Sequence, residues 1–143
     1  MRVLGLDLGE KRIGVALSDP LGWTAQGLQV IATKGSTEAN LASIQEIVRR
    51  YEVERVIVGL PRNMDGSPGP GAKKAKMFAG RLSKILGIPV EMYDERLTTV
   101  AAERVLLEAD LSRTKRRKVI DKMAAAFILQ GYLDAQSGKE QKR

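Results

Sequence analysis

The N-terminal segment contains two short runs in which apolar residues alternate with others, and this pattern constrains the fold more than any other. The first run is VLGLDL, from Val3 to Leu8, and the second is IGVAL, from Ile13 to Leu17. Alternation with a period of two is typical of a β-strand, and the GEK sequence between the runs is typical of a turn. The chain is therefore expected to begin with a β-hairpin.

The rest of the chain predicts a third strand and then alternating helices and strands. Tight connections favour antiparallel neighbours, whereas helical crossovers favour parallel ones. The order βββαβαβαα thus predicts an α/β fold in which helices flank a mixed five-stranded sheet. This fold is expected to form a single domain at residues 1–135, followed by a polar tail at residues 136–143. The expected elements are a strand at 23–33, a helix at about 37–51 capped by Ser36 or Thr37, a buried strand at 55–60, a loop at 61–71, a helix at about 72–86 that Gly87 ends, a strand at 88–93 and helices at about 98–109 and 115–135.

Two of the predicted helices have a clear inner face. In the helix at 72–86, this face is expected to contain Ala75, Phe78, Ala79, Leu82 and Ile85. In the last helix, spacings of three and four place on one face Asp121, Ala124, Ala125, Ile128 and Tyr132. Small side chains in this stripe would let the helix approach the sheet closely and bring Asp121 near the strand ends.

Acidic residues interrupt the apolar pattern at three distant places. Asp7 lies within the first strand, Asp94 and Glu95 end the fifth strand, which is expected to be buried, and Asp121 lies on the stripe of the last helix. An unpaired carboxylate in a sheet is costly, so each acid is either a hydrogen-bonded structural residue or a ligand of a cation. Three such acids favour convergence on a divalent metal, because clustered carboxylates repel one another without one. The spacing leaves the choice between Asp94 and Glu95 open.

The absence of histidine and cysteine narrows the possible chemistry. It excludes disulfides, thiolate chemistry, a serine–histidine triad and histidine-ligated zinc within this chain. A site with oxygen ligands alone favours Mg²⁺ or Mn²⁺, and such a carboxylate cluster can hold two metals about 3.5–4 Å apart. The lack of cysteine also favours a reducing cytoplasm. No apolar run is long enough for a membrane span, and no signal peptide is evident.

Basic residues outnumber acidic ones by 24 to 17, which suggests a polyanionic partner such as nucleic acid, but composition alone does not distinguish this from a merely basic surface, and the positions of the charges must decide. The segment SRTKRRK, which begins at Ser112, precedes Asp121 on the last helix. Cations at a helix N-terminus oppose its dipole, so bound phosphates would explain them better than solvation does. Lys73 and Lys74 end a loop that is interpreted as either a clamp on the substrate or an inert surface loop. The expected nucleic-acid contacts are Lys11, Arg12, Arg96, Arg113, Lys115, Arg116 and Arg117.

Four segments together resemble the YqgF (RuvX) family, a bacterial branch of the ribonuclease H-like, RuvC-type nucleases. In order along the chain they are MRVLGLDLGEKRIGVALSD, VGLPRNMDGS, YDERLTT and DKMAAAFIL. The resemblance extends from Met1 to about Leu133. It implies a ribonuclease H-like fold and a metal-dependent endonuclease that resolves Holliday junctions or matures the 5′ end of pre-16S ribosomal RNA. It also implies that the catalytic, metal-binding acids are Asp7, Glu95 and Asp121.

One departure from the pattern of related nucleases concerns a fourth acid near the third. The neighbouring helix positions here are Lys118, Ala124 and Ala125, so a second metal is expected to bind weakly or only with substrate phosphate. Asp19 or Asp94 could assist from outside the main three. The competing hypothesis is a non-catalytic nucleic-acid-binding or ribosome-assembly factor, and an actin-like ATPase is less favoured because 143 residues cannot supply its second lobe. DNA versus ribosomal RNA, and monomer versus homodimer, stay open.

Overall fold

The mixed sheet predicted from the sequence is present in the structure, which is a computed structural model. The structure describes residues 1–9, 11–33, 36–60, 71–94 and 113–141, and in the last of these segments it describes the side chains of residues 122–137 alone. The five strands lie in the order β3-β2-β1-β4-β5. Neighbours β1–β2 and β2–β3 are antiparallel, whereas β1–β4 and β4–β5 are parallel. The strands are β1 (Val3–Leu8), β2 (Arg12–Ser18), β3 (Ala25–Ala32), β4 (Arg55–Leu60) and β5 (Val90–Asp94).

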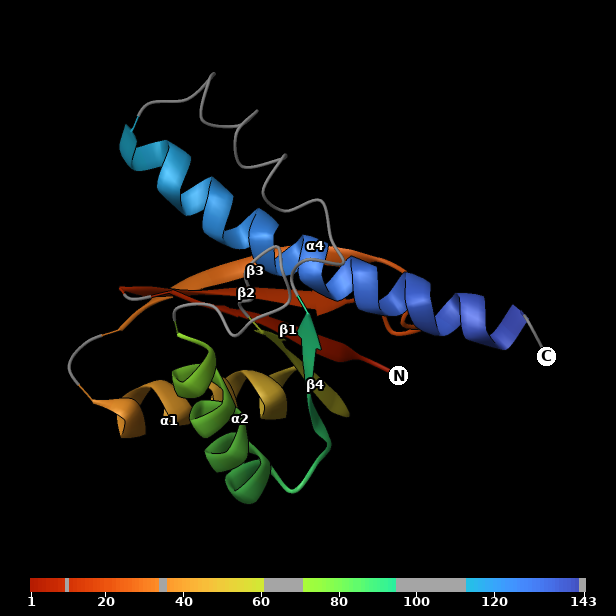
Figure 1. The fold of residues 1–143 in the computed structure, drawn as a ribbon, viewed down its shortest axis with the longest axis horizontal. Coiled ribbons are helices and arrows are strands. Elements are labelled where there is room, and N and C mark those ends of the chain that lie inside the picture. Colours follow the sequence, from red (N-terminus) through yellow and green to blue (C-terminus); the bar gives the residue numbers. More distant parts are fainter. Residues whose placement is uncertain (10, 34–35, 61–70, 95–112, 142–143) are drawn as a thin grey trace.

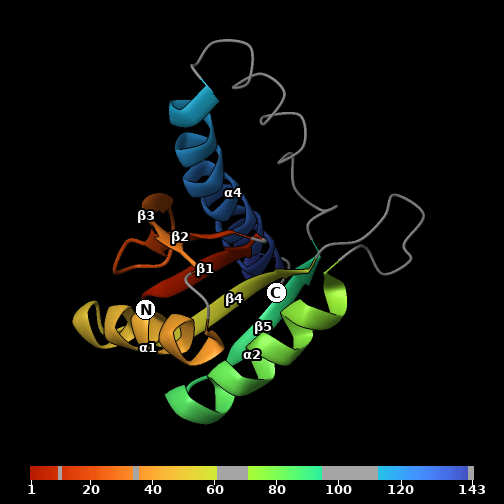
Figure 2. The ribbon, with the colours of Figure 1, turned by 90° about the vertical axis from the view of Figure 1, so that its left-hand side faces the viewer.

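Helices cover both faces of this sheet. Helix α4 (Arg113–Gln141) crosses one face, and α1 (Thr37–Arg50) and α2 (Ala72–Leu86) cover the other (Figure 1). Figure 2, turned by 90°, shows the same three layers. Ser36 caps α1 by accepting a hydrogen bond from the Ala39 amide at 3.2 Å, and Gly87 ends α2 in the left-handed conformation, as the sequence predicted.

Strand alternation divides the apolar side chains between two cores. Leu4 and Leu6 of β1 pack toward α1 and α2, together with residues such as Ile44 and Leu82. The opposite face of the sheet contributes Val3, Ala16 and Ile57 to a second core, in which α4 supplies Ala124, Ala125, Ile128, Leu129, Tyr132 and Leu133. The predicted inner stripe of the last helix is therefore confirmed from Ala124 to Tyr132.

Three predictions from the sequence are wrong in detail. Strand β5, expected to be buried, has residues that are all half-buried, because within the part of the chain that the structure describes it lies at the edge of the sheet, beside β4. Ile85, expected on the inner face of α2, is 43% exposed, because in this last turn it is Leu86 that packs against the core. Helix α4 does not end near residue 135 but continues to Gln141.

The predicted loop at 61–71 lies outside the described residues except for Gly71, and the predicted helix at 98–109 lies entirely outside them. Within the described ranges, no helix combines the length and apolarity that crossing a bilayer requires.

Candidate active site at the carboxyl edge of the parallel strands

The three parallel strands β1, β4 and β5 end at the same edge of the sheet. Leu6 pairs with Val58 and Val58 with Met92, so the strands are in register across this edge. Asp7 lies one residue beyond Leu6, and Asp94, paired with Leu60, is the last residue of β5. Open α/β sheets bind ligands outside the carboxyl ends of their strands. The described acids Asp7 and Asp94 therefore lie where the fold favours a site.

Asp7 is half-buried on the face of the sheet that α4 covers. Its neighbours on β1 at positions of the same parity are Val3, which belongs to the α4 core, and Gly5, which faces α4 directly. Across the hairpin, Asp7 pairs with Gly14, which has no side chain to fill the space beside the carboxylate. Asp7 also takes part in a polar interaction. The structure thus puts this carboxylate at the rim of the sheet and not in its interior.

Contacts of two kinds position α4 over this face. The first is close backbone packing, since a Cβ added to Gly5 would lie 2.8 Å from Leu129 Cβ and 3.2 Å from the Ala125 carbonyl oxygen. The second is a set of hydrogen bonds near the opposite edge. Gln130 Oε1 accepts from the Ala25 amide at 2.9 Å, and Arg55 Nη1 donates to the Tyr132 hydroxyl at 2.9 Å.

The Arg55 guanidinium also ties α4 to the edge strand. Its Nη1 atom donates to Glu91 Oε1 of β5 at 2.6 Å. The hydrogen bond with Tyr132 is the main cause that raises the pKa of Arg55 above its usual value. Burial, with smaller effects of the Asp134 and Asp94 charges, raises the pKa of the Tyr93 hydroxyl. Tyr93 meets the Tyr132 ring edge-to-face, with ring centroids 6.1 Å apart.

The three predicted metal ligands are described to different extents. Asp7 is described completely, Glu95 lies outside the described residues, and Asp121 has a described backbone within α4 but no described side chain. Among the described side chains, no group of three potential ligands comes together. The three-acid site remains a prediction.

Asp19 does not belong to this edge, and the suggestion that it could assist the site is wrong. It follows β2, whose end pairs with the start of β1 through Leu17 and Leu4, so it lies at the sheet edge opposite Asp7. Its Oδ1 atom accepts hydrogen bonds from the amides of Trp23 at 2.6 Å and Thr24 at 3.0 Å. These bonds, that of Thr24 foremost, lower the pKa of Asp19 and give it a structural role in the turn.

Of the predicted basic contacts, Lys11 and Arg12 are described, at the turn of the first hairpin. The Gly9 amide donates to the Arg12 carbonyl oxygen at 2.8 Å and closes this turn beside Asp7. Arg96 lies outside the described residues. The cluster Arg113, Lys115, Arg116 and Arg117 forms the first turns of α4, with side chains that are not described.

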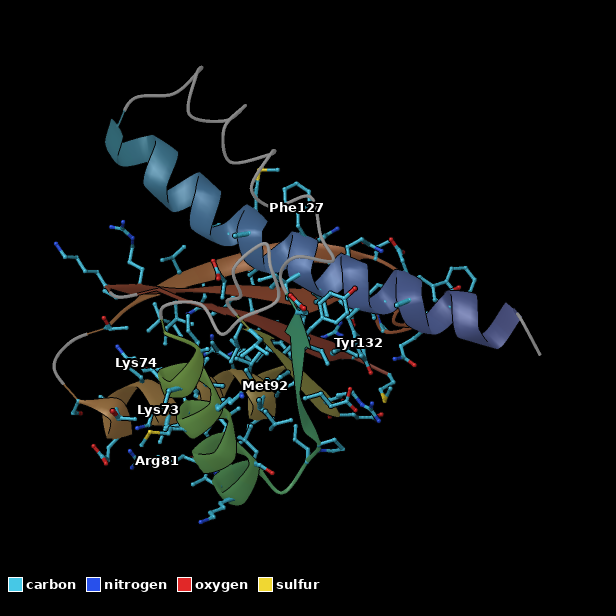
Figure 3. All side chains as sticks on the ribbon, viewed as in Figure 1. Lys73, Lys74, Arg81, Met92, Phe127 and Tyr132 are labelled. Atoms are coloured by element: carbon cyan, nitrogen blue, oxygen red, sulfur yellow. The ribbon has the colours of Figure 1, made fainter. Side chains whose placement is uncertain are left out.

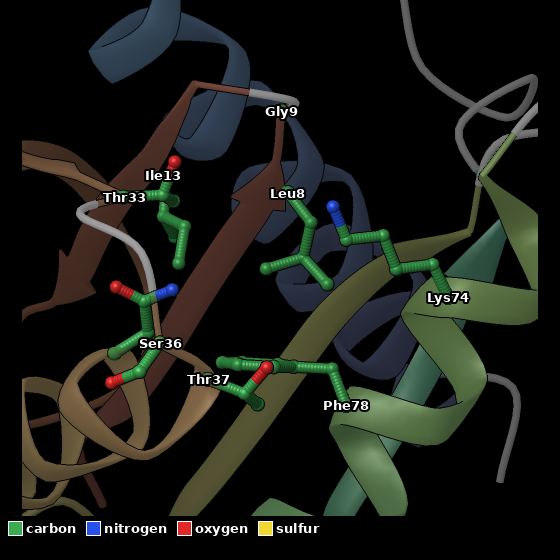
Figure 4. Close-up of a pocket in the computed structure, with 9 residues that line it drawn as sticks. Leu8, Gly9, Ile13, Thr33, Ser36, Thr37, Lys74 and Phe78 are labelled. Carbon is green, nitrogen blue, oxygen red and sulfur yellow. The ribbon is translucent and has the colours of Figure 1, made fainter.

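Lys74 and Lys122 lie on the two opposite faces of the sheet. Lys74 extends from α2 toward Leu8 at the end of β1, in a pocket of about 310 Å³ that Gly9 and Phe78 also line (Figure 4). Lys122 of α4 lies over Gly27 of β3, at the other face. Sequence reasoning did not single out Lys122, although a glycine within a strand is a signal of close approach.

Comparison with known proteins supports one family. The family model described as "RuvX: Holliday junction resolvase" matches residues 1–135. A protein of Pelotomaculum thermopropionicum named "Putative pre-16S rRNA nuclease" is 63% identical over 136 residues, covering 95% of this chain and 88% of that protein. A protein of Moorella thermoacetica with the same name is 63% identical over 134 residues, covering 94% and 95% respectively.

Solved structures extend the likeness to the fold. The chain superposes on Thermus thermophilus RuvC in complex with a Holliday junction with a TM-score of 0.57 and 19% identity, covering 96% of both chains. It superposes on a fowlpox virus resolvase bound to Holliday junction DNA with a TM-score of 0.54 and 13% identity, covering 95% of this chain and 99% of the other. At these identities the likeness shows the ribonuclease H-like fold alone, and this part of the prediction is confirmed.

Proposed function

The chain belongs to the RuvX family, and we propose that it is a divalent-metal-dependent endonuclease acting on phosphodiester bonds of structured nucleic acid. The names of its relatives favour pre-16S ribosomal RNA as the substrate, with the 5′ end as the site of processing implied by the family resemblance, and the family description favours resolution of Holliday junctions. In this proposal, Asp7, Glu95 and Asp121 are the catalytic acids that hold the metal.

The position of Asp7 relative to α4 carries the proposal. Gly5 contacts Ala125 and Leu129, while Val3 lines a pocket with Tyr132 and Leu133, so β1 and α4 run in opposite directions. Moving from Gly5 to Asp7 advances about 7 Å along the strand, and moving back from Ala125 to position 121 advances about 6 Å along the helix. The two steps lead in the same direction, which supports a meeting of the two carboxylates.

Strand alternation supports Glu95 over Asp94 as the second acid. Met92 packs in the core beneath α1 and α2, whereas Tyr93 packs in the core beneath α4. Successive residues of a strand point to opposite faces, so Asp94 has the parity of Met92. Continuing this pattern by one residue would assign Glu95 to the face that carries Asp7.

The donor chemistry fits a hard divalent cation. The chain contains no histidine or cysteine, so its possible side-chain ligands are oxygen atoms, which Mg²⁺ and Mn²⁺ prefer. When bound, such an ion would lower the pKa of a water molecule and stabilise charge on the phosphate. The half-buried position of Asp7 on a rigid strand would keep its carboxylate aimed at that ion. Lys11 and Arg12, on the adjoining turn, would hold the nucleic-acid backbone against the repulsion of the acids.

The experiment that tests the proposal compares substrates and metals with the purified protein. A labelled four-way junction and a precursor ribosomal RNA fragment are incubated with Mg²⁺, Mn²⁺, Ca²⁺ or a chelator, with linear duplexes of matched length as controls. We expect cleavage of at least one structured substrate in Mg²⁺ or Mn²⁺ and none with the chelator. Binding without cleavage under all these conditions would reject the nuclease and favour the second candidate.

The second candidate is a nucleic-acid-binding or ribosome-assembly factor without efficient cleavage. One observation favours it. Ala124 and Ala125, at the helix positions where a fourth acid would lie, are 1% and 0% exposed against the sheet. These two positions therefore supply no carboxylate, and a site with three acids would hold a second metal less tightly.

A further inference from the structure

A groove on the α4 face of the sheet begins at Arg12, near the turn that follows Asp7. It has a volume of about 410 Å³ and is lined by Arg12, Gln29, Val30, Ala32 and Lys122. Arg12 pairs with Ala32, and Gly14 pairs with both Asp7 and Val30. Val30 therefore lies two strands away from Asp7 in the same row, about 10 Å at ordinary strand spacing.

Close packing of α4 on β3 sets the position of Lys122 in this groove. A Cβ added to Gly27 would lie 2.9 Å from Lys122 Cβ and 3.3 Å from its carbonyl oxygen. Glycine at this position lets the helix backbone approach the edge strand. The exposed Lys122 side chain thereby leaves α4 directly above β3, one residue after Asp121 in the sequence.

The groove is lined by both positively charged and apolar side chains. Among the residues that the structure describes, its lining includes two cations, Arg12 and Lys122, and no carboxylate. The sequence from Pro20 to Thr37, which contains β3, has no aspartate or glutamate at all. Phosphates would be attracted to the positive charges of Lys122 and Arg12, and sugars or base faces would cover Val30 and Ala32. A single polynucleotide strand carries charged phosphates next to less polar sugars and bases, whereas a free anion offers charge alone.

We propose that one strand of the nucleic-acid substrate leaves the acidic edge along this groove, with Lys122 and Arg12 contacting successive parts of its phosphate backbone. This inference rests on the proposed function, whose site it extends. It assigns to Lys122 a role in binding substrate that is separate from the role of the acids in cleavage. Contacts to phosphates carry no direct sequence information, so the groove accepts DNA and RNA strands alike.

A second basic groove, of about 430 Å³, offers the main competing path. Lys73, Lys74 and Arg81 line it on α2, on the side of the sheet away from Phe127 and Tyr132 of α4 (Figure 3). Arg81 there pairs with Glu38 at 2.6 Å, so part of its charge is already balanced. The Lys122 groove is favoured because it shares the face of Asp7.

The test measures how affinity depends on salt in single-charge variants. Labelled single-stranded DNA, four-way junction and RNA are titrated with the wild type and with Lys122→Gln, which keeps the Cβ packing on Gly27. We expect weaker binding of all three probes, with the slope of log affinity against log salt flattened by about 0.7–0.9 for the one lost contact. Cleavage at saturating substrate should change less than affinity.

Two controls make the outcome specific. Lys84→Gln removes the same charge from the exposed far end of α2 and should leave the salt slope unchanged. The double variant Lys73→Gln/Lys74→Gln tests the competing groove. An unchanged slope in Lys122→Gln, or a loss confined to the Lys73/Lys74 variant, would overturn the inference.

The same experiment separates this inference from the nuclease proposal. If the wild type binds but does not cleave, the nuclease is rejected while the slope still tests the groove. If the wild type cleaves and Lys122→Gln binds normally, the groove is rejected alone. A wild type that binds none of the three probes would reject both.

Discussion

Gly5 of β1 and Leu129 of α4 lie so close that a Cβ atom at Gly5 would stand 2.8 Å from the Cβ of Leu129. Protein side chains do not tolerate such a distance without movement. This contact therefore sets how near α4 lies to the sheet, and with it the height of the helix positions about two turns earlier, where Asp121 lies. A glycine in the middle of a strand here serves the geometry of the site.

The first prediction is that Gly5→Ala destabilises the protein and impairs cleavage. Added bulk in a packed core costs about 1–3 kcal/mol, and here it presses against the Ala125 backbone as well as a side chain. Unfolding in urea measures the first effect, and cleavage of the preferred substrate measures the second. The control is Gly80→Ala on α2, where an added Cβ meets nothing within 4 Å. That variant should gain about 0.5–1 kcal/mol, as is usual for an exposed helix position.

The second prediction concerns Asp7→Asn, which removes charge and keeps shape. Removing a residue that hydrogen-bonds to a metal ligand typically lowers metal affinity or activity by about 10–100-fold. Loss of a direct ligand should therefore reduce cleavage by more than about 100-fold. Affinity for nucleic acid should hold or rise, because repulsion between the carboxylate and phosphate is relieved. Fluorescence anisotropy and a cleavage assay on the same preparation separate the two. A variant that still cleaves normally would remove Asp7 from the catalytic acids.

The third prediction ranks the two acids at the end of β5. Glu95→Gln should abolish cleavage, whereas Asp94→Asn should keep a measurable fraction, because strand alternation gives Asp94 the parity of Met92 and not of Asp7. Initial rates in Mn²⁺ and Mg²⁺ provide the measurement. The opposite ranking would mean that the assignment of the motif YDERLTT to a catalytic glutamate is wrong.

The fourth prediction concerns the basic start of α4. If Arg116 and Arg117 contact phosphates, changing both to alanine should flatten the salt dependence of binding by about 0.7–0.9 per contact, for DNA and RNA alike. Cleavage at saturating substrate should change less, provided that Asp121 keeps its place on the helix. A salt slope equal to that of the wild type would identify this cluster as solvated surface.

The fifth prediction is a dependence of stability on pH through Asp19. Its pKa is lowered from 3.8 by hydrogen bonds that the Thr24, Trp23 and Gly22 amides donate. A carboxylate with a lowered folded-state pKa contributes stability above its unfolded pKa, and this contribution is lost as pH falls through the folded value. The stability difference between the wild type and Asp19→Ala should therefore shrink below pH 3.8. Denaturant unfolding at several pH values measures it, and a difference that stays constant would contradict the prediction.

The sequence by itself determined the elements and their directions. Alternation from Val3 to Leu17, the continuous apolar run of β4 and the helical spacing of Ala124, Ala125 and Ile128 are local signals, and each corresponds to an element of the structure. Connection lengths then predicted which strands are parallel. The candidate acids could be named because they break these local patterns, and the choice of Glu95 came from a family resemblance.

Tertiary structure decided which residues share a face and an edge. Asp7 lies in β1 and Asp19 directly follows β2 of the same hairpin, yet antiparallel pairing places them at opposite edges of the sheet. Lys122 shows no special pattern along the helix, and only the tertiary structure reveals that it packs over Gly27 and lines a groove together with Arg12. Such relationships depend on contacts between residues far apart in the chain, which the periodicity of any single segment does not encode.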